Sequence, residues 1–418
     1  MSAPLVQHYS SWKVRCGIAD YAADVIGGLD SCGVRSAIMP VGLVENPNLS
    51  LHDMHREYDE LASRTAKADL VHIQHEFSFF SRISTDHANL VFTDCLHRLI
   101  KTGKPIAITF HSPAFSMGYQ PMPEERLGLK AQIRKSVKQA IYGTHDFLRS
   151  RKKPETIISL MQKHRDQIRV IVHTQKTRLQ YAELGIPSEI ISVLPMGFKP
   201  RSENIKVSRN EARRILGISE DRTLLSIFGF ISRYKGPLTA ARALKLLPAD
   251  YSLALVGGLH PQTTEPILED VLKLWKKQDP SRLFITGYVS SEQVDLWQSA
   301  TDFCLAPYLE IGMSGSAAIT WAISSGKPVI ASKTTTFREI YDASSAMMMV
   351  TPDCPHELAW TIKNLAASPE LASDLVQKAR AYTEANGFDK IAAKMLELYR
   401  QFPSFPATAT APAKLKAA

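Results

Sequence analysis

The fold is decided by the stretch from Leu224 to Gly236, which reads LLSIFGFISRYKG. Its first five residues form a mostly apolar run of strand length, and Gly229 opens a turn after them. Two cations, Arg233 and Lys235, then follow. In an open parallel α/β sheet, ligands bind beyond the carboxyl ends of the strands, so a diphosphate could be held here by a guanidinium fork and a point charge. A solvated surface turn fits the same residues, and the stretch alone leaves both interpretations open.

A second stretch, Glu310 to Ser332, favours the anion site. It reads EIGMSGSAAITWAISSGKPVIAS, with small residues ahead of an apolar helix-length run. A helix N-terminus carries about half a positive charge and several unpaired N–H groups. The segment Met313-Ser314-Gly315-Ser316 could therefore hold an anion with its backbone. The alternative is that Ser314-Gly315-Ser316 only caps a core helix.

This second stretch resembles the donor-binding loop and helix of the retaining GT-B glycosyltransferases of family 4, also called glycosyl transferases group 1. Further segments resemble the family in the same order along nearly the whole chain: WKVRCGIADY at 12–21, VHIQHEF at 71–77, IAITFH at 106–111, VIVHT at 170–174, VLPMG at 193–197 and LALVGG at 253–258. Each segment is a weak signal alone, whereas their order and spacing together are specific.

The chain reads as an α/β protein on independent grounds. Short β-rich runs alternate with helix-length intervals, which is typical of βαβ units and parallel sheets. We expect strands at 70–74, 106–110, 170–172, 191–194, 224–228, 252–256, 283–286, 303–306 and 329–331. Two such sheets in series predict a GT-B fold, with two Rossmann-like domains facing an interdomain cleft.

The domain boundaries follow from linkers and from the resemblance. A polar segment interrupted by Pro200 separates an N-terminal acceptor domain, residues 1–200, from a C-terminal nucleotide-sugar domain, residues 201–386. Ser208, with Glu211 three residues later, predicts the first helix of the second domain. The resemblance implies that the helix at 387–403 crosses back to the first domain, and the low-complexity residues 404–418 are expected to be disordered.

The resemblance also implies roles for individual residues. The residues expected to act in catalysis are His111, Arg233, Lys235 and Glu310. The donor would be bound by Gly17, Gly229, Arg233, Lys235, Gly312, Met313, Ser314, Gly315 and Ser316. Weaker candidates for binding or orienting the acceptor are Arg15, His75 and Glu76. A histidine such as His111 near a strand end is also compatible with a purely structural role, and Glu76 could equally pair with Arg15.

One departure from the family matters. Its members usually carry a second Glu on the helix that leads to Gly-Lys-Pro, where this chain has Ala318 or, counted back from Gly326, Trp321. The carboxylate that commonly binds the ribose is therefore missing, and the donor base stays open. Some members replace it by a turn like Ser-Gly-Ser.

No metal or other cofactor is expected. The chain contains no Asp-x-Asp, the usual holder of a metal-bridged diphosphate, and two cations can replace the metal. His72, His75 and Glu76 lie at a strand end, where their spacing does not converge on an ion as it would on a helix. Five cysteines without a C-x-x-C pair support neither a disulfide framework nor a zinc site. By the resemblance, the anomeric configuration is retained, and the leaving phosphate deprotonates the acceptor.

The net charge of +9 is concentrated in residues 126–169, which hold twelve Lys and Arg against three Asp and Glu. An anionic membrane surface or a pyrophosphate-bearing acceptor could bind there. An amphipathic helix with a solvated basic face is the alternative. Nucleic acid is not expected, because no binding motif accompanies the charge. The sequence shows no signal peptide or apolar run of bilayer length, so we expect a cytoplasmic protein or one attached peripherally to the inner face of the membrane.

Three functions compete at this point. The leading one is transfer of a sugar from a nucleotide-sugar to a saccharide, glycolipid or lipid-linked acceptor. The second is a GT-B scaffold or binding protein that has lost catalysis, which the missing Glu would explain. The third, a UDP-sugar 2-epimerase, would need paired acidic and histidine residues in the cleft that the sequence does not place.

Overall fold

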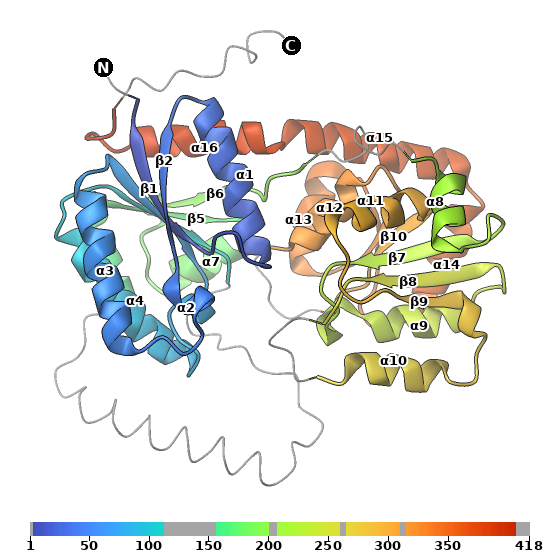
Figure 1. The fold of residues 1–418 in the computed structure, drawn as a ribbon. Helices are drawn as coiled ribbons and strands as arrows, with labels where there is room; N and C mark the ends of the chain where they lie inside the picture. The colour runs from blue at the N-terminus through green and yellow to red at the C-terminus, as the bar shows by residue number, and fades with distance from the viewer. Residues whose placement is uncertain (1–2, 113–155, 200–206, 260–264, 310–314, 407–418) are drawn as a thin grey trace.

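The protein consists of two α/β domains, each built on a six-stranded sheet whose paired strands are parallel (Figure 1). The computed structural model describes residues 3–112, 156–199, 207–259, 265–309 and 315–406. This architecture confirms the expected pair of Rossmann-like domains.

The first domain has the strand order β2-β1-β3-β4-β5-β6. Its strands are β1 (Leu5–Ser10), β2 (Arg35–Pro40), β3 (Leu70–His75), β4 (Ile106–Phe110), β5 (Ile168–Val172) and β6 (Ile191–Val193). Its helices are α1 (Gly17–Ser31), α2 (Gly42–Glu45), α3 (Leu51–Ala66), α4 (Thr85–Ile100), α6 (Ile157–Lys163) and α7 (Gln175–Glu183). Apolar cores lie on both faces of this sheet, because its central strands are buried on both sides.

The second domain has the strand order β12-β11-β10-β7-β8-β9. Its strands are β7 (Thr223–Phe228), β8 (Tyr251–Val256), β9 (Leu283–Ile285), β10 (Phe303–Ala306), β11 (Val329–Ser332) and β12 (Met348–Val350). Its helices are α8 (Arg209–Leu216), α9 (Pro237–Lys245), α10 (Ile267–Trp275), α11 (Ser291–Ala300), α12 (Ala317–Ser324), α13 (Thr335–Ser344), α14 (Pro355–Ala366) and α15 (Pro369–Ala385). Ser208 caps α8 by accepting a hydrogen bond from the Glu211 N–H, as the sequence predicts.

The last helix, α16 (Phe388–Arg400), packs on the first domain beside α1, and α15 and α16 follow each other across both domains in Figure 1. Gly28 makes the close approach of α1 to α16 possible, because a Cβ there would lie 2.6 Å from the Ala392 Cβ. The chain stays packed past this helix. Phe405 is buried against Tyr399, so the expected disorder from residue 404 is corrected at this position.

All nine strands expected from sequence are present, and the structure adds β1, β2 and β12. The resemblance implied β1 only as the strand before the first glycine loop. The strands β2 and β12 lie at the edges of their sheets, where only one neighbour covers them. Partly exposed residues interrupt their apolar runs, so the pattern is weak.

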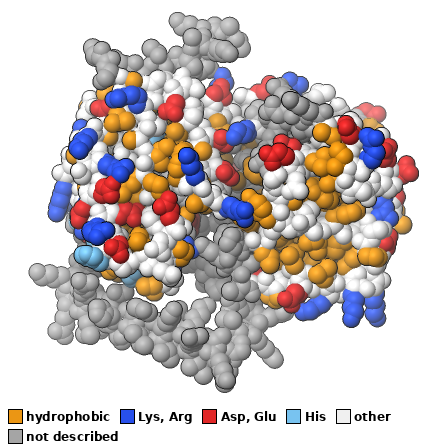
Figure 2. Space-filling view, in the orientation of Figure 1, with side chains coloured by type: hydrophobic (Ala, Val, Ile, Leu, Met, Phe, Trp, Pro, Cys, Tyr) orange, Lys and Arg blue, Asp and Glu red, His pale blue; other side chains and the backbone are white. Residues whose placement is uncertain are grey.

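The expected basic segment at 126–169 lies mostly outside the described residues, which include only its part from 156 onward. On the face of the first domain seen in Figure 2, basic and acidic side chains are interspersed. Within the described chain, no helix is long and apolar enough to cross a membrane.

Candidate active site

Lys235 is a buried cation at the carboxyl end of the second sheet. It lies in a 3₁₀ turn after β7, and only 5% of its surface is exposed. Among the described residues, none forms an ion pair with its ammonium, and burial lowers the pKa of Lys235 to about 7. A buried ammonium without a counter-ion is unfavourable unless an anion joins it. A negatively charged ligand beside this ammonium would offset that cost.

The Lys235 ammonium packs against Gly229, which has no side chain to obstruct it. The residue has a φ of 89°, and a Cβ there would lie 2.8 Å from Lys235 Nζ and 3.5 Å from the Ala318 Cβ. Ala318 is one of the two positions at which the family's second Glu was expected. Ala318 supplies no negative charge that could compensate Lys235.

Two helix N-termini meet beside this lysine. A Cβ on Gly17, the first residue of α1, would lie 3.8 Å from the Ala317 Cβ, at the first residue of α12. Ser316 caps α12 through the Ile319 N–H and lies 3.2 Å from the Tyr308 hydroxyl. Both helices direct the positive ends of their dipoles toward the gap between the domains.

The guanidinium of Arg233 is engaged elsewhere. Its Nη2 donates to Asp270 Oδ2 on α10 at 2.8 Å, and its Nε lies 4.0 Å from Glu265 Oε2. The structure thus places Lys235 beside Gly229 but pairs Arg233 with acidic residues. The sequence suggested that the Arg233 guanidinium binds a diphosphate. That diphosphate would have to compete with Asp270 for the guanidinium.

Arg15 contacts Tyr288 rather than Glu76, the partner that the sequence suggested. Its guanidinium lies 4.1 Å from the centre of the Tyr288 ring, a cation–π contact between the two domains. Glu76 instead accepts a hydrogen bond from Ser112, and burial raises the pKa of its carboxyl. The sequence left open a Glu76–Arg15 pair, and the structure does not form it.

His75 belongs to the core of the first domain. Its side chain is fully buried, stacked on Phe80 at 5.0 Å and set among the rings of Phe92 and Phe110. Burial lowers the pKa of its imidazole to about 3. Strand alternation explains the misassignment, because residues 71, 73 and 75 share the face of β3 that packs against α4. This placement removes His75 from the acceptor candidates.

His111 follows β4 and has both ring nitrogens engaged within the protein. Its Nε2 lies 2.7 Å from Gln74 Oε1, and its Nδ1 lies 3.3 Å from His173 Nε2. Burial and the neighbouring His173 lower its pKa well below the usual value. His111 would have to give up one of these bonds to donate to a sugar hydroxyl. The His173 imidazole lies beside the start of α12, because a Cβ on Gly315 would lie 3.6 Å from His173 Cδ2.

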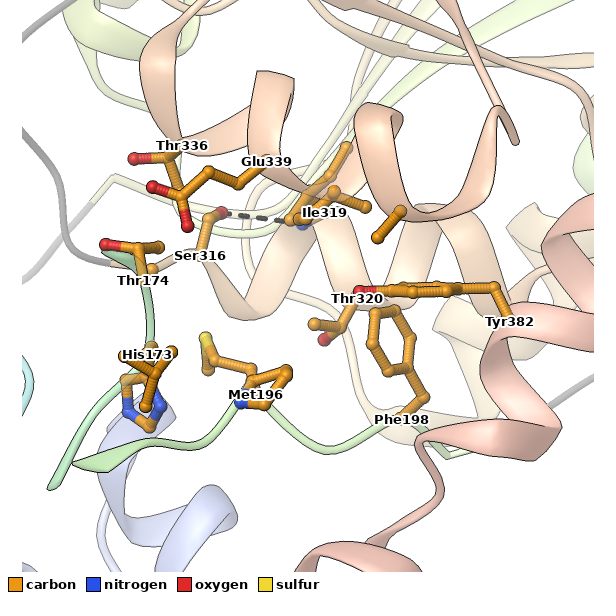
Figure 3. Close-up of a pocket in the computed structure, with 15 residues that line it drawn as sticks. His173, Thr174, Met196, Phe198, Ser316, Ile319, Thr320, Thr336, Glu339 and Tyr382 are labelled. Carbon is orange, nitrogen blue, oxygen red and sulfur yellow. Dashed lines mark hydrogen bonds between the residues drawn. The ribbon is translucent and has the colours of Figure 1, made fainter. Parts of the chain in front are cut away.

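A cavity of about 200 Å³ lies between the domains next to these histidines (Figure 3). His173, Thr174 and Met196 line it from the first domain, and Ser316 and Glu339 line it from the second.

Glu339 on α13 also joins the two domains directly. Its carboxylate accepts from the backbone N–H groups of Gln175 at 2.7 Å and Lys176 at 2.8 Å, which begin α7. The negative charge thus caps the positive end of a helix in the other domain.

Glu310, Gly312, Met313 and Ser314 lie outside the described residues, whereas Gly315 and Ser316 lie at the α12 N-terminus and line the cavity. The part of the chain that the structure describes holds no group of three or more His, Cys, Asp or Glu able to bind a metal ion.

Sequence reasoning missed Glu339 and used His173 only as a strand-turn signal. The only local signal for His173 was its position after β5, where ligand-binding residues gather in parallel sheets. Glu339 contacts residues 164 and 163 positions away, and nothing in its local sequence indicates this.

The fold and this site together define a class, the two-domain GT-B proteins. Within the chain, residues 222–368 match the family model of the glycosyl transferases group 1. A D-inositol 3-phosphate glycosyltransferase from Xylanimonas cellulosilytica is 27% identical over 223 residues, 52% of each chain. This chain therefore spans about half the length of that relative.

Solved structures share the whole architecture. Anabaena HepE in complex with UDP superposes with a TM-score of 0.65 at 15% identity, over 95% of this chain and 99% of the other. Sucrose-phosphate synthase from Thermosynechococcus elongatus gives 0.66 at 18% identity, over 95% and 98%. A glycosyltransferase from Rickettsia africae gives 0.67 at 15% identity, over 96% and 98%. At these identities the likeness establishes the fold.

Proposed function

We propose that the protein is a metal-independent, retaining glycosyltransferase that moves a sugar from a nucleotide diphosphate-sugar to a saccharide, glycolipid or lipid-linked acceptor. The observation that carries this proposal is the buried Lys235 ammonium, which lacks a counter-ion among the described residues and lies beside Gly229. The group 1 match over residues 222–368, which contain this lysine, supports the same conclusion.

The chemistry follows from where charge develops. As the bond between the anomeric carbon and the diphosphate breaks, negative charge grows on the leaving phosphate. Lys235 and the N–H groups at the start of α12 are fixed before the reaction, so they stabilise this charge without reorganising. Low polarity around the lysine strengthens the interaction. The phosphate oxygen then takes the proton of the acceptor hydroxyl as that hydroxyl attacks on the same face of the sugar.

The first experiment is a donor panel with a nucleotide-release readout, containing UDP-, GDP- and ADP-sugars. UDP-sugars come first, because UDP occupies the Anabaena HepE structure. Lys235→Met is expected to lower turnover roughly a hundredfold to a thousandfold, the usual effect of losing one preorganised donor. Near-full activity of Lys235→Met would contradict the assignment.

Lys327→Met is the matched control. Lys327 is a second lysine of this domain whose pKa is lowered by burial, but its Nζ donates to the Ser299 carbonyl at 3.3 Å. Turnover is expected to fall only with Lys235→Met. A similar loss in both variants would indicate a general effect on the domain.

Retention and metal independence have their own tests. The anomeric proton of the product, observed by NMR, shows whether the donor configuration is kept. Activity is expected to persist in EDTA, since Lys235 supplies positive charge at the phosphate. Inverted product would overturn the mechanism, and loss of activity in EDTA that Mg²⁺ restores would overturn metal independence.

The second candidate is a GT-B binding protein without catalysis. It is favoured by the Arg233–Asp270 pair and by Ala318 at a position where the family's second Glu was expected. Calorimetry with UDP, GDP and ADP separates the two. Tight nucleotide binding without release from any nucleotide-sugar would identify the binding protein.

Membrane attachment through residues 126–169 stays part of the proposal. Co-sedimentation with vesicles of neutral lipid, with and without anionic lipid, tests it. Binding that requires anionic lipid and disappears at high salt is expected.

A further inference from the structure

Five side chains form a continuous hydrogen-bonded chain through the first domain, from α16 to the interdomain cavity. The Tyr399 hydroxyl lies 2.7 Å from His72 Nδ1, and the Gln74 amide lies 3.3 Å from His72 Nε2. The same amide lies 2.7 Å from His111 Nε2. His111 Nδ1 lies 3.3 Å from His173 Nε2. Tyr399, His72 and Gln74 are at most 2% exposed, so water does not replace these bonds.

The direction of the chain is fixed at its cavity end. His173 Nδ1 lies 3.0 Å from the Leu194 carbonyl oxygen, which can only accept. His173 therefore carries its proton on Nδ1, and Nε2 of the neutral imidazole accepts. The neighbouring His111 Nδ1 must then donate, which leaves His111 Nε2 as an acceptor.

The Gln74 amide completes the chain only when its oxygen and nitrogen are exchanged relative to the placement given above, in which Oε1 faces His111 Nε2 and Nε2 faces His72 Nε2. Its NH₂ group can donate to His111 Nε2 and its oxygen can accept from His72 Nε2–H, which Thr109 Oγ1 shares at 2.8 Å. His72 Nδ1 then accepts from the Tyr399 hydroxyl. The two ends of an amide have nearly the same shape, so this orientation keeps the observed distances.

The opposite orientation requires an extra proton or loses a hydrogen bond. With Gln74 Oε1 facing His111, Nε2 of that imidazole must donate, so either one of the two adjacent histidines carries both protons or the 3.3 Å contact between His111 and His173 carries no hydrogen. Burial opposes this charge, because it lowers the pKa of His173 to about 4 and that of His111 well below its usual value. The uncharged, fully matched chain is therefore the form expected at neutral pH.

We propose that Gln74 is a positioning residue, which, with Tyr399 at the far end of the chain, fixes the tautomer of His111 and the ring orientation of His173 at the interdomain cavity. The effect on transfer rests on the proposed function, whereas the protonation pattern does not. Tyr399 lies on α16, 327 positions after His72. Through these hydrogen bonds, the packing of α16 on the first domain helps to set the positions of the histidines at the cavity.

The test is ¹⁵N NMR of the full chain with labelled histidine, at pH 7. The wild type is expected to show the Nδ1–H form for His111 and His173 and the Nε2–H form for His72. Gln74→Glu supplies only acceptors, so His111 Nε2 must donate and the imidazole is expected to become doubly protonated. An Nε2–H form of His111 in the wild type, or a neutral Nδ1–H His111 in Gln74→Glu, would overturn the proposal.

A control variant matches the Gln74→Glu substitution. Gln7→Glu places a carboxylate at another buried glutamine of the sheet, whose amide donates to the His8 and Ala37 carbonyls outside the chain. His111 is expected to stay neutral there. Its protonation in this control as well would overturn the specific role of Gln74.

The far end of the chain is tested through its hydroxyl. Tyr399→Phe should shift the His72 Nδ1 resonance, because that nitrogen loses its donor. Tyr9→Phe removes a buried hydroxyl that donates to Glu57, and it should leave this resonance in place. An unchanged His72 signal in Tyr399→Phe would exclude Tyr399 from the chain.

Kinetics give a second readout where transfer is measurable. Gln74→Glu is expected to lower kcat about tenfold to a hundredfold through misplaced groups. The donor KM should stay within about twofold, because the phosphate-binding groups are untouched. A change in KM alone would overturn the positioning role. Absence of transfer from every donor would defeat the proposed function and leave the NMR result standing.

Discussion

The carboxylate of Glu339, in the second domain, accepts a hydrogen bond of 2.7 Å from the backbone N–H of Gln175, in the first. It also accepts from the next N–H of α7, so one side chain binds two donors at a helix start. The contact joins the two domains at the edge of the cavity that Glu339 lines.

Glu339→Gln should weaken that contact between the domains. The amide keeps one acceptor but loses the charge that the helix dipole favours, an interaction of about 0.3–1 kcal/mol at exposed sites. A larger radius of gyration by small-angle X-ray scattering is expected. Glu357→Gln is the control, because Glu357 accepts from the Thr351 N–H within one domain. Equal radii for both variants would show that Glu339 does not hold the domains together.

Nucleotide binding should be coupled to proton uptake through Lys235. Burial lowers its pKa to about 7, so at pH 8 most free protein carries the neutral amine. A bound diphosphate favours the ammonium, and uptake approaching about one proton per nucleotide is expected at pH 8 and little at pH 6. Calorimetry of UDP binding in buffers of different ionisation enthalpy measures this. Uptake that persists in Lys235→Met would assign it to another group.

The same shift makes stability depend on pH. Because the folded pKa of Lys235 lies below its ordinary value of 10.5, folding disfavours the charged form. The destabilisation is therefore full below pH 7 and is relieved as the pH rises from 7 toward 10.5. Lys235→Met is expected to remove this component of the pH profile in urea unfolding. An identical profile in wild type and Lys235→Met would show that the lysine is charged in the folded protein.

Gly229→Ala should impair nucleotide binding beyond its effect on stability. The new Cβ would lie 2.8 Å from Lys235 Nζ and would occupy a left-handed conformation that costs about 1–2 kcal/mol. Gly217→Ala is matched in conformation, with a φ of 70°, but no atom lies within 4 Å of its Cβ. Thermal unfolding should fall in both variants, and UDP affinity only in Gly229→Ala. Equal affinities would place the nucleotide away from Gly229.

Asp270→Asn should strengthen nucleotide binding if Arg233 turns to the diphosphate. Removing the competing carboxylate frees the guanidinium, and a several-fold lower Kd is expected, comparable to a partly exposed ion pair of about 1 kcal/mol. The gain should vanish in the Arg233→Ala background. Asp279→Asn, which removes the partner of Arg222 at 3.5 Å, is the control. An unchanged Kd for Asp270→Asn would assign Arg233 a purely structural role.

Local sequence was sufficient for much of the fold. Buried central strands read as continuous apolar runs, and Ser208 and Pro369 mark helix starts by their side-chain and ring chemistry. The edge strands β2 and β12 were not predicted, because partly exposed residues interrupt their apolar runs. The turn after β7 that carries Gly229 and Lys235 was predictable from the sequence, whereas the part of these residues in donor binding stays a prediction.

The sequence by itself therefore determined the order of elements and the position of the cation-bearing turn, because periodicity, caps and turns act over a few residues. Only the tertiary structure decided which charges stay unpaired. Arg233 meets Asp270 across 37 positions, Tyr399 reaches His72 across 327, and His75 turns into the core. Such pairings arise when packed elements bring distant side chains together, and no local pattern encodes them.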